Sequence, residues 1–397
     1  MLKNLYKIIH ELPLLWAVSG MFIINGGDKT LVAIIIISTL TKALGHLLRI
    51  DRIEISYSFI KKILLVMVIY SSFKYYTNGY SSSEIRVLIS TLLYAFISFP
   101  RKIPIKPLIT VSCLSSIFVL VQTIYIMNGH NWDRMQLPLN AIPYANYSAT
   151  ISLLAFVAML FVKEIKFKYL SALALICYSI VVLVVDTRGT WLALLAAYSA
   201  IASLFVFHKR SWKLTVSIVS SFIIIPIVCY PIVEDRVENS KREVALLAQG
   251  NLDSSWGMRI QLWQAGYQIF RDNPSIEGLG QTAHLQMIQD MYKQGRVKAS
   301  LAQFDNKNFH NSIIDRTVKY GLIGLILYIA IILTPIYYGL RQEFNYKSIL
   351  FIALPTFIFT AGLTYIPLSH PGTYFIYLFC LIANSNEPNN IEENNAI

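Results

Sequence analysis

The sequence predicts an all-α integral membrane protein with about 12 transmembrane helices and one large outer loop. Of its 397 residues, 55% are hydrophobic and 14% are charged, whereas an ordinary soluble domain is nearer to about 25% charged. The mean hydropathy is +0.53. One long polar interval, 234–316, interrupts the apolar runs. Since lipid offers the backbone no hydrogen-bonding partner, apolar runs of this length are expected to be helical.

Twelve apolar runs reach or approach the length of about 20 residues that a helix needs to cross a bilayer. They lie at 8–26, 30–48, 59–76, 83–100, 107–127, 144–162, 168–186, 190–207, 214–233, 317–340, 348–365 and 371–385. The third, fourth and twelfth are the least regular, because Lys61-Lys62 begin the third, Arg86 lies inside the fourth, and the twelfth is short.

The formal net charge of +12 is spread in small groups between the apolar runs. A nucleic-acid-binding protein would gather its cations on one soluble face, so we expect no nucleic-acid partner. With the N-terminus in the cytoplasm, the inner segments hold 17 lysines and arginines. The short outer loops hold five, namely Lys29, Lys74, Arg86, Arg134 and Arg188. Cations favour the cytoplasmic side, which predicts that both termini are cytoplasmic.

The same orientation divides the chain into four parts. Residues 1–233 carry the first nine transmembrane helices, 234–316 form the outer loop, 317–385 carry the last three helices, and 386–397 form a polar tail expected to be disordered. Within the loop, apolar residues from Trp256 to Phe270 recur every three or four positions, which predicts a helix. Ser254 or Ser255 is expected to cap it, with the aromatic stripe packing against the spans or the bilayer surface. A second helix is expected at 282–294 after the flexible Glu277-Gly278-Leu279-Gly280.

Several common catalytic devices are missing from the sequence. There is no phosphate-binding GxxxxGK[ST] loop, no GxSxG elbow, no HExxH pair and no DxD motif. Paired carboxylates suited to glycoside hydrolysis are not evident either. The four cysteines lie in apolar runs and do not form a metal-binding pattern. We therefore expect no metal and no cofactor.

Two outer arginines are candidates for binding an anion. Arg188 lies in the tight turn Asp186-Thr187-Arg188-Gly189, at the lip of the bundle, where it either meets an anionic ligand or is an interface anchor paired with Asp186. Arg259 lies near the start of the predicted loop helix. Its guanidinium, with several hydrogen-bond donors in one plane, could bind a phosphate. The alternative is a solvated arginine on the surface.

His310 lies where the outer loop returns to the membrane, followed by Asn311. An imidazole can accept a proton from an attacking hydroxyl near neutral pH; the alternative is a capping or interface histidine. A zinc site of His284, His310 and a carboxylate would require a ligand spacing that the sequence does not contain. Gly321 and Gly324 lie three residues apart, which favours the close approach of a neighbouring helix.

These residues together resemble a known family. The pattern of an outer His310-Asn311, nine further residues, and then Gly321-x-x-Gly324 is similar to that of the O-antigen ligases of lipopolysaccharide assembly. The resemblance extends to the layout of spans, the single large loop, Thr187-Arg188-Gly189, the segment ending at Arg259, and Asn273-Pro274 followed by Gly278-Leu279-Gly280. It covers most of the chain in layout and about 190–324 in motif.

The resemblance implies a glycosyltransferase of the bacterial inner membrane whose active site is periplasmic. Such an enzyme transfers O-antigen polysaccharide from undecaprenyl pyrophosphate to the lipid A–core, and no nucleotide donor is involved. Arg188 and Arg259 would bind the pyrophosphate, His310 would be the general base of a metal-independent inverting displacement, and Asn311 would orient the histidine or a sugar. An O-antigen polymerase that uses the same donor, and a flippase or exporter of lipid-linked glycans, are the alternatives.

Overall fold

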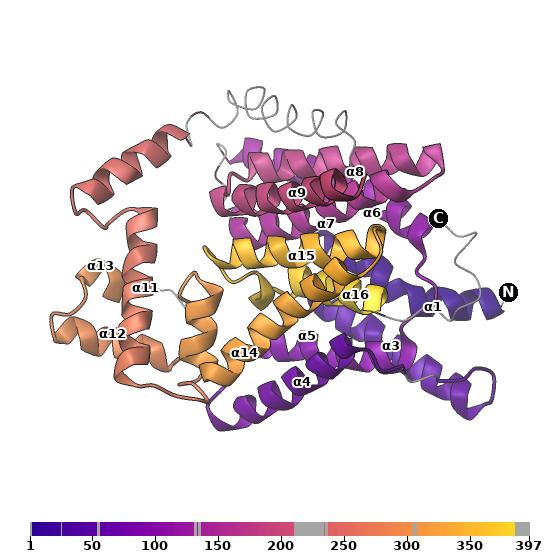
Figure 1. Cartoon of the computed structure of the whole chain (residues 1–397), viewed down its shortest axis with the longest axis horizontal. Coiled ribbons are helices and arrows are strands. Elements are labelled where there is room, and N and C mark those ends of the chain that lie inside the picture. Colours follow the sequence, from indigo (N-terminus) through magenta and orange to yellow (C-terminus); the bar gives the residue numbers. More distant parts are fainter. Residues whose placement is uncertain are drawn as a thin grey trace.

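The computed structural model describes residues 2–24, 26–53, 56–130, 133, 136–209, 234, 237–304 and 308–385. In those ranges the regular structure is helical, and they contain no strand. Figure 1 shows two regions, a bundle whose long helices lie side by side and a smaller group of helices at its left end. The predicted all-α class is therefore confirmed.

The first half of the bundle is built from helices that alternate with short turns. They are α1 (Leu2–Ala17), α2 (Gly20–Ile23), α3 (Gly27–Leu47), α4 (Phe59–Thr77), α5 (Ser82–Leu93) with the π-helical turn η1 (Tyr94–Ser98), α6 (Ile105–Gly129), α7 (Ala141–Phe161), α8 (Ile165–Val184) and α9 (Arg188–Lys209). The bundle is completed by α14 (Ser312–Arg341), α15 (Tyr346–Gly362), the 3₁₀ turn η3 (Pro367–Ser369) and α16 (Pro371–Ser385).

Eleven of the 12 predicted apolar runs coincide with one of these helices or with two consecutive ones. The ninth run, 214–233, lies outside the described residues. Among the described helices, six are long and apolar enough to cross a membrane: α3, α6, α7, α8, α9 and α14. The protein is therefore a multi-pass membrane protein, and the count of 12 crossings stays a prediction.

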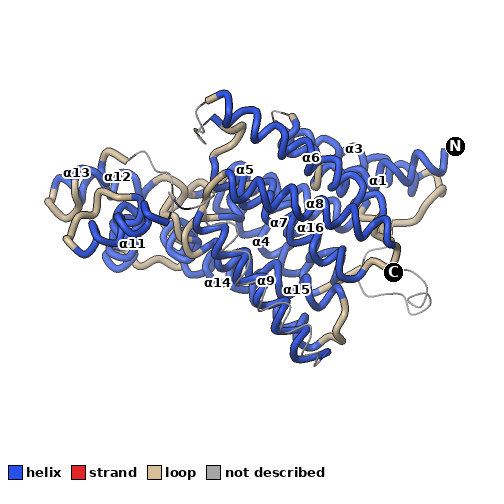
Figure 2. Tube along the Cα trace, turned by 90° about the horizontal axis from the view of Figure 1, so that it is seen from above, coloured by secondary structure: helices blue, strands red, loops and turns tan. Residues whose placement is uncertain are grey.

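Helix α7 lies at the centre of the bundle. In the most apolar stretch of 18 residues of α7, 67% is buried inside the protein. The corresponding share in the other five candidate spans is 22–39%. It packs against α8 and α15, and α15 packs in turn against α9 and α14 (Figure 2). The start of α7 lies close to the turn that carries Arg188, since the Thr190 hydroxyl donates to the Asn146 side chain (2.7 Å).

A second, smaller core holds the helices of the polar interval together. This interval contains α11 (Ser255–Asp272), α12 (Ala283–Lys293) and α13 (Ala299–Ala302), and residues 237–248 are also helical. Leu262, Ile269, Ile288, Leu301 and Phe309 are buried against one another there. Figures 1 and 2 both place this group beyond one end of the bundle. Burial of these side chains gives the loop a core of its own.

Both predicted loop helices are confirmed, and so is the cap of the first. The Ser254 side chain accepts a hydrogen bond from the Gly257 amide (3.1 Å) and satisfies one free donor of the first turn of α11. The predicted packing face is displaced, however. Leu262, Ala265 and Ile269 make the buried face, whereas Tyr267 of the aromatic stripe is 65% exposed. The inner face uses smaller side chains because α12, α13 and the start of α14 approach closely.

The segment between α11 and α12 is tied to α14 by backbone hydrogen bonds and is not a flexible linker. The amides of Leu279 and Gly280 donate to the carbonyls of Val318 (3.0 Å) and Lys319 (2.9 Å). The Ile323 amide donates to the Ile276 carbonyl (3.2 Å). We call residues 275–281 the strap, because they cross α14 at its break.

Helix α14 breaks at Gly321, where φ is 65° and ψ is −167°. A Cβ there would lie 2.2 Å from the Ile276 carbonyl oxygen and 2.4 Å from the Gly278 amide nitrogen. The predicted role of Gly321 in helix–helix packing is therefore wrong, since its close neighbour is the backbone of the strap. Only glycine readily adopts this conformation, so Gly321 allows α14 to bend and the strap to pass.

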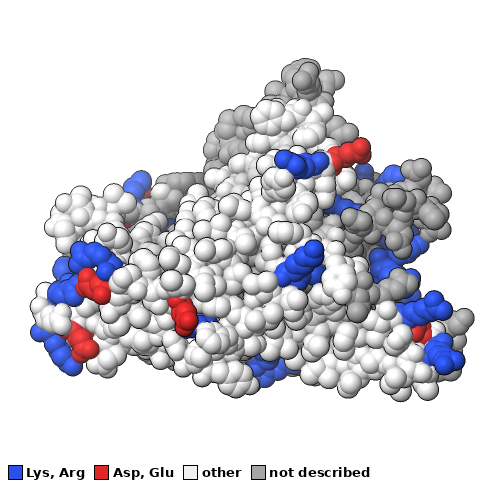
Figure 3. All heavy atoms as spheres, turned by 60° about the horizontal axis from the view of Figure 1, so that its bottom comes forward, with Lys and Arg blue, Asp and Glu red and all other residues white. Residues whose placement is uncertain are grey.

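Charged side chains are unevenly spread over the described surface. Figure 3 shows one face, in which uncharged atoms cover most of the centre while lysine, arginine and carboxylate side chains gather toward its ends. Leu114, Ile326 and Leu333 are among the large apolar side chains left exposed on the candidate spans. Exposed apolar side chains on long helices are typical of a surface covered by lipid.

Candidate active site

Arg188 and Arg259 line one pocket at the junction between the bundle and the loop helices. The pocket is formed by the first turns of α7, α9 and α11 and by the residues after α15. Its lining residues are Ile142, Asn146, Thr187, Arg188, Gly189, Thr190, Ser255, Arg259, Ala361, Thr364 and Tyr365. Two arginines that lie 71 residues apart in the sequence therefore face the same space.

Arg188 is the first residue of α9, directly after a turn in which Asp186 has a positive φ of 57°. Its guanidinium donates to the Ser240 hydroxyl (2.7 Å) and to the Glu243 carboxylate (2.6 Å). The side chains of Arg188 and Glu243 are 16% and 15% exposed. The suggested pairing of Arg188 with Asp186 is thus replaced by a pairing with the helical segment 237–248.

Glu243 joins the two walls of the pocket. One carboxylate oxygen accepts from Arg188, and the other accepts from the Trp256 amide in the first turn of α11 (3.3 Å). A carboxylate is favoured at a helix N-terminus because the amides there carry partial positive charge. Glu243 was not identified from the sequence, because segment 237–248 contains two acidic and two basic residues and nothing local distinguishes this carboxylate from Glu238.

Arg259 enters the pocket from the second turn of α11. Its guanidinium carbon lies 5.7 Å from the centre of the Trp256 ring, a cation–π distance. Its charge adds to the effect of burial in lowering the pKa of His310. Arg259 is thus placed to act on an anion in the pocket and on the histidine beside it.

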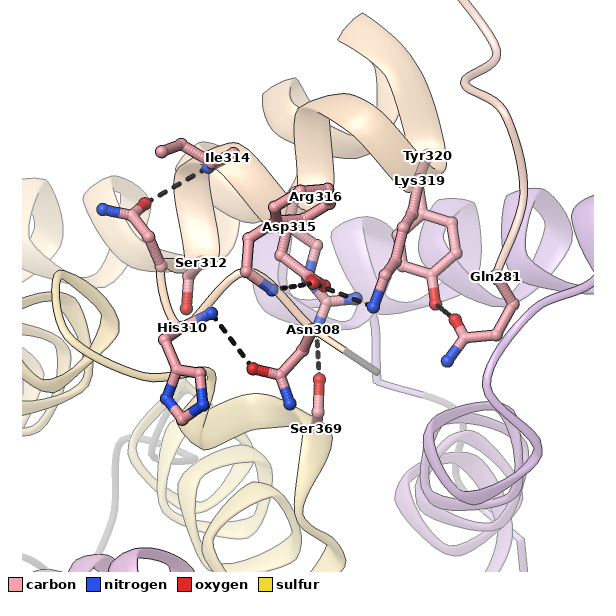
Figure 4. Close-up of polar contacts among 12 residues, drawn as sticks. Gln281, Asn308, His310, Ser312, Ile314, Asp315, Arg316, Lys319, Tyr320 and Ser369 are labelled. Atoms are coloured by element: carbon pink, nitrogen blue, oxygen red, sulfur yellow. Dashed lines mark hydrogen bonds and ion pairs between the residues drawn. The ribbon is translucent and has the colours of Figure 1, made fainter. Parts of the chain in front are cut away.

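His310 lies beside Tyr365, with 5.2 Å between the ring centres. Its backbone has a positive φ of 49°, and its amide donates to the Asn308 side chain (3.0 Å; Figure 4). Burial lowers the pKa of His310 to about 4, the nearby charge of Arg259 lowers it further, and Asp315 opposes both. Because that pKa is far below 7, the imidazole is neutral at neutral pH and has a lone pair to accept a proton.

Asn311 caps α14. Its side-chain oxygen accepts from the amides of Ile313 (2.9 Å) and Ile314 (3.2 Å), and its nitrogen donates to the Leu363 carbonyl (3.2 Å). Both ends of the amide are engaged in these bonds. Asn311 therefore fixes where the helix begins, and it orients His310 through the backbone.

A buried ion-pair network anchors the same turn (Figure 4). The Asp315 carboxylate accepts from the Phe309 amide (3.2 Å) and pairs with Lys319 (2.8 Å), and the side chains of Asp315 and Lys319 are each 2% exposed. Arg316 pairs with Glu84 of α5, which also accepts from the Ser369 hydroxyl (2.6 Å). The Asp315–Lys319 pair lies within α14, whereas the Arg316–Glu84 pair joins the first turns of α14 to α5.

Asn146, a polar residue that lines the pocket, was not identified from the sequence. Asn146 lies in the second turn of α7, and its side-chain oxygen accepts from the Thr190 hydroxyl (2.7 Å). Thr187 lies beside Arg188 and is 5% exposed. The available signal was a lone asparagine inside an otherwise apolar span, a position where polar residues tend to be functional.

The suggested zinc site is not assembled in the described part of the chain. No group of three or more histidine, cysteine, aspartate or glutamate side chains is gathered there in a way that could hold a metal ion. His284 is instead buried in the core of the loop, with its ring centre 4.9 Å from that of Phe309.

The fold and the pocket define a multi-pass helical membrane protein in which Arg188 and Arg259 line one pocket and His310 contacts Tyr365, another residue that lines it. The family model described as O-Antigen ligase matches residues 172–329, a range that includes Arg188, Arg259, His310 and both glycines of the pattern. This part of the chain is therefore similar to the O-antigen ligase family.

Two relatives show the same similarity. The chain is 24% identical to a protein named O-antigen ligase from Escherichia coli K12 over 329 residues, which are 77% of this chain and 73% of that protein. It is 26% identical to an uncharacterized protein of Haemophilus influenzae Rd over 209 residues. That second match spans about half of each chain, 51% of this one and 50% of the relative.

Proposed function

We propose that the protein is an O-antigen ligase. It transfers O-antigen polysaccharide from undecaprenyl pyrophosphate to the lipid A–core at the periplasmic face of the inner membrane. The observation that carries this proposal is the pocket that Arg188 and Arg259 share, together with the contact of His310 with Tyr365, a residue that lines the pocket. The family match adds the class of substrate, a lipid-linked glycan.

The two arginines suit the leaving group of this reaction. Breaking the bond between the sugar and undecaprenyl pyrophosphate leaves negative charge on the phosphate oxygens. Arg188 from the bundle and Arg259 from the loop would stabilise that charge from two sides, and guanidinium groups bind phosphates in a fixed, two-pronged geometry. Cleavage of the bond between the sugar and the lipid pyrophosphate then supplies the free energy for the transfer, so that no nucleotide-linked sugar is needed as the donor.

His310 would be the general base that takes the proton of the acceptor hydroxyl. The acceptor oxygen would attack the anomeric carbon as the phosphate leaves, with inversion at that carbon. The charge of Arg259 lowers the pKa of His310, so phosphate bound to Arg259 would offset that charge and raise the basicity of the imidazole. Donor binding would therefore activate the base, and this favours binding of the donor before the acceptor.

Transfer with purified components tests the proposal. Full-length protein in detergent is incubated with lipid-linked O-antigen and lipid A–core, with and without a chelator, and the product is followed by gel. We expect transfer by the wild type in both conditions. Transfer onto a second lipid-linked glycan in place of the core would show that the protein is a polymerase. No transfer to either acceptor would favour the remaining alternative, a flippase or exporter.

Replacing His310 with alanine should lower the transfer rate about 100-fold or more, the usual contribution of a general base. His130→Ala is the matched control, because this histidine is exposed and does not line the pocket. In a bacterial strain, the His310 variant should insert normally and yet leave lipopolysaccharide without O-antigen. A normal lipopolysaccharide ladder from that strain would refute the assignment of His310 as the base.

A further inference from the structure

The pocket that Arg188 and Arg259 line also has a buried side, which we call its inner wall. Two polar groups of this inner wall have no partner among the described residues. They are the side-chain nitrogen of Asn146 and the hydroxyl of Thr187. Asn146 is 1% exposed and Thr187 is 5% exposed. A buried N–H group without an acceptor is costly and uncommon in folded proteins, so its presence in a pocket indicates a ligand.

The orientation of Asn146 is set by its neighbour. The Thr190 hydroxyl donates to the amide oxygen of Asn146 (2.7 Å), and Thr190 is itself 1% exposed. With the oxygen held by Thr190, the NH₂ group is left to donate to whatever occupies the pocket. Thr190, Thr187 and Arg188 belong to a single turn, so the same backbone segment positions an anchoring hydroxyl, a free hydroxyl and a guanidinium.

The hydrogen-bond donors that line the pocket indicate which chemical group of a ligand could bind to the Asn146 nitrogen and the Thr187 hydroxyl. An amide N–H requires an acceptor, and two guanidinium groups line the same space. An oxyanion with several oxygens matches both needs, because some oxygens can meet the arginines while another reaches the inner wall. A neutral amide is also suited to the deeper position, since another buried cation would cost more to desolvate.

We propose that Asn146 and Thr187 form an uncharged donor subsite that binds a non-bridging oxygen of the diphosphate held by Arg188 and Arg259. This inference rests on the proposed function and extends its binding site from two residues to four. Asn146 is here a donor-binding residue, and Thr190 positions it. The subsite favours a diphosphate over a single phosphate, because one phosphate cannot as readily span from the arginines to the inner wall.

Binding of inorganic pyrophosphate to the full-length protein in detergent tests the subsite, with orthophosphate as a second probe and anionic phospholipid micelles as a third. Asn146→Leu keeps the side-chain size and removes the donor, and Thr187→Val does the same for the hydroxyl. We expect each to weaken pyrophosphate binding about tenfold, the effect of one hydrogen bond to a charged ligand. Asn146→Asp should weaken it more, because a carboxylate repels the anion.

Ser148→Ala is the control, because Ser148 is a fully buried residue of the same helix whose hydroxyl also has no partner among the described residues, yet it does not line the pocket. It should bind pyrophosphate like the wild type. A melting temperature measured for each variant identifies any that fails to fold, and Thr187→Val then decides the outcome if Asn146→Leu is unstable.

The outcomes separate this inference from the proposed function. If Arg188→Ala and Arg259→Ala weaken binding while folded Asn146 and Thr187 variants bind within twofold of the wild type, the subsite is refuted and the arginine site stands. If neither arginine variant weakens binding, the anion site itself is refuted. Tighter binding of phospholipid than of pyrophosphate would assign the pocket to lipid headgroups and overturn the diphosphate proposal.

Discussion

Replacing Gly321 with alanine should loosen the junction between the loop and the bundle. The residue has φ 65° and ψ −167°, a region that side-chain-bearing residues rarely adopt. An added Cβ would lie 2.2 Å from the Ile276 carbonyl oxygen. Neither a rotamer change nor a small shift relieves a contact of this kind, because the atom it meets is backbone.

The magnitude follows from two contributions. The backbone conformation costs a non-glycine residue about 1–3 kcal/mol. Moving the strap also weakens three backbone hydrogen bonds, from Leu279, Gly280 and Ile323, each worth about 0.5–1.5 kcal/mol. The expected loss of stability is therefore about 2.5–7.5 kcal/mol if all three bonds are lost.

Thermal unfolding of the purified protein in detergent measures this effect. We expect Gly321→Ala to lower the melting temperature by several degrees and to reduce transfer, since His310 lies directly before the start of the same helix. Gly129→Ala is the matched control, because Gly129 ends α6 and a Cβ there meets nothing within 4 Å. If the two variants melt at the same temperature, the strap does not depend on the bend at Gly321.

Two further predictions concern charges in the loop. Glu243→Gln removes the carboxylate that neutralises Arg188, so it should tighten pyrophosphate binding about tenfold; equal or weaker binding, measured by calorimetry, would show that Glu243 does not compete with the ligand. For His284, burial and the nearby Lys319 lower the pKa to about 4, against the opposing effect of Asp315. Because the unfolded chain binds this proton at about pH 6.5, stability should fall as the pH drops from about 6.5 toward 4. A melting temperature that is flat across this window, or unchanged in slope by His284→Gln, would contradict that prediction.

Features set by local sequence were predicted well. The loop helix, its Ser254 cap and its end at Asp272 follow from spacing and capping rules that act within a few residues. The placement of Arg188 and Arg259 toward one side followed from the order of the apolar runs, and the structure brings both to one pocket. The helix, its cap and its end depend on neighbouring residues and only a little on which distant segments of the chain pack together.

Features set by contacts between distant segments were not predicted. Glu243 bonds Arg188 across 55 residues, and Asn146 bonds Thr190 across 44. A sequence pattern does not reveal such partners, because many acidic and amide side chains are compatible with the same local helix. Gly321 shows a related ambiguity, since a glycine in an apolar helix fits both close helix packing and a break. The conformation that distinguishes the two is imposed by the strap.

The strap also determines which insertions and substitutions the loop can accept as related sequences diverge. Its bonds to α14 join main-chain atoms, so they constrain the number of residues between α11 and α12 more than the identity of most of them. An inserted residue would put every later amide out of step with its carbonyl on α14, whereas most exchanged side chains would leave the pairing intact. Relatives of this protein can therefore be expected to vary in composition here while keeping a fixed length, with glycine required only where the two backbones meet.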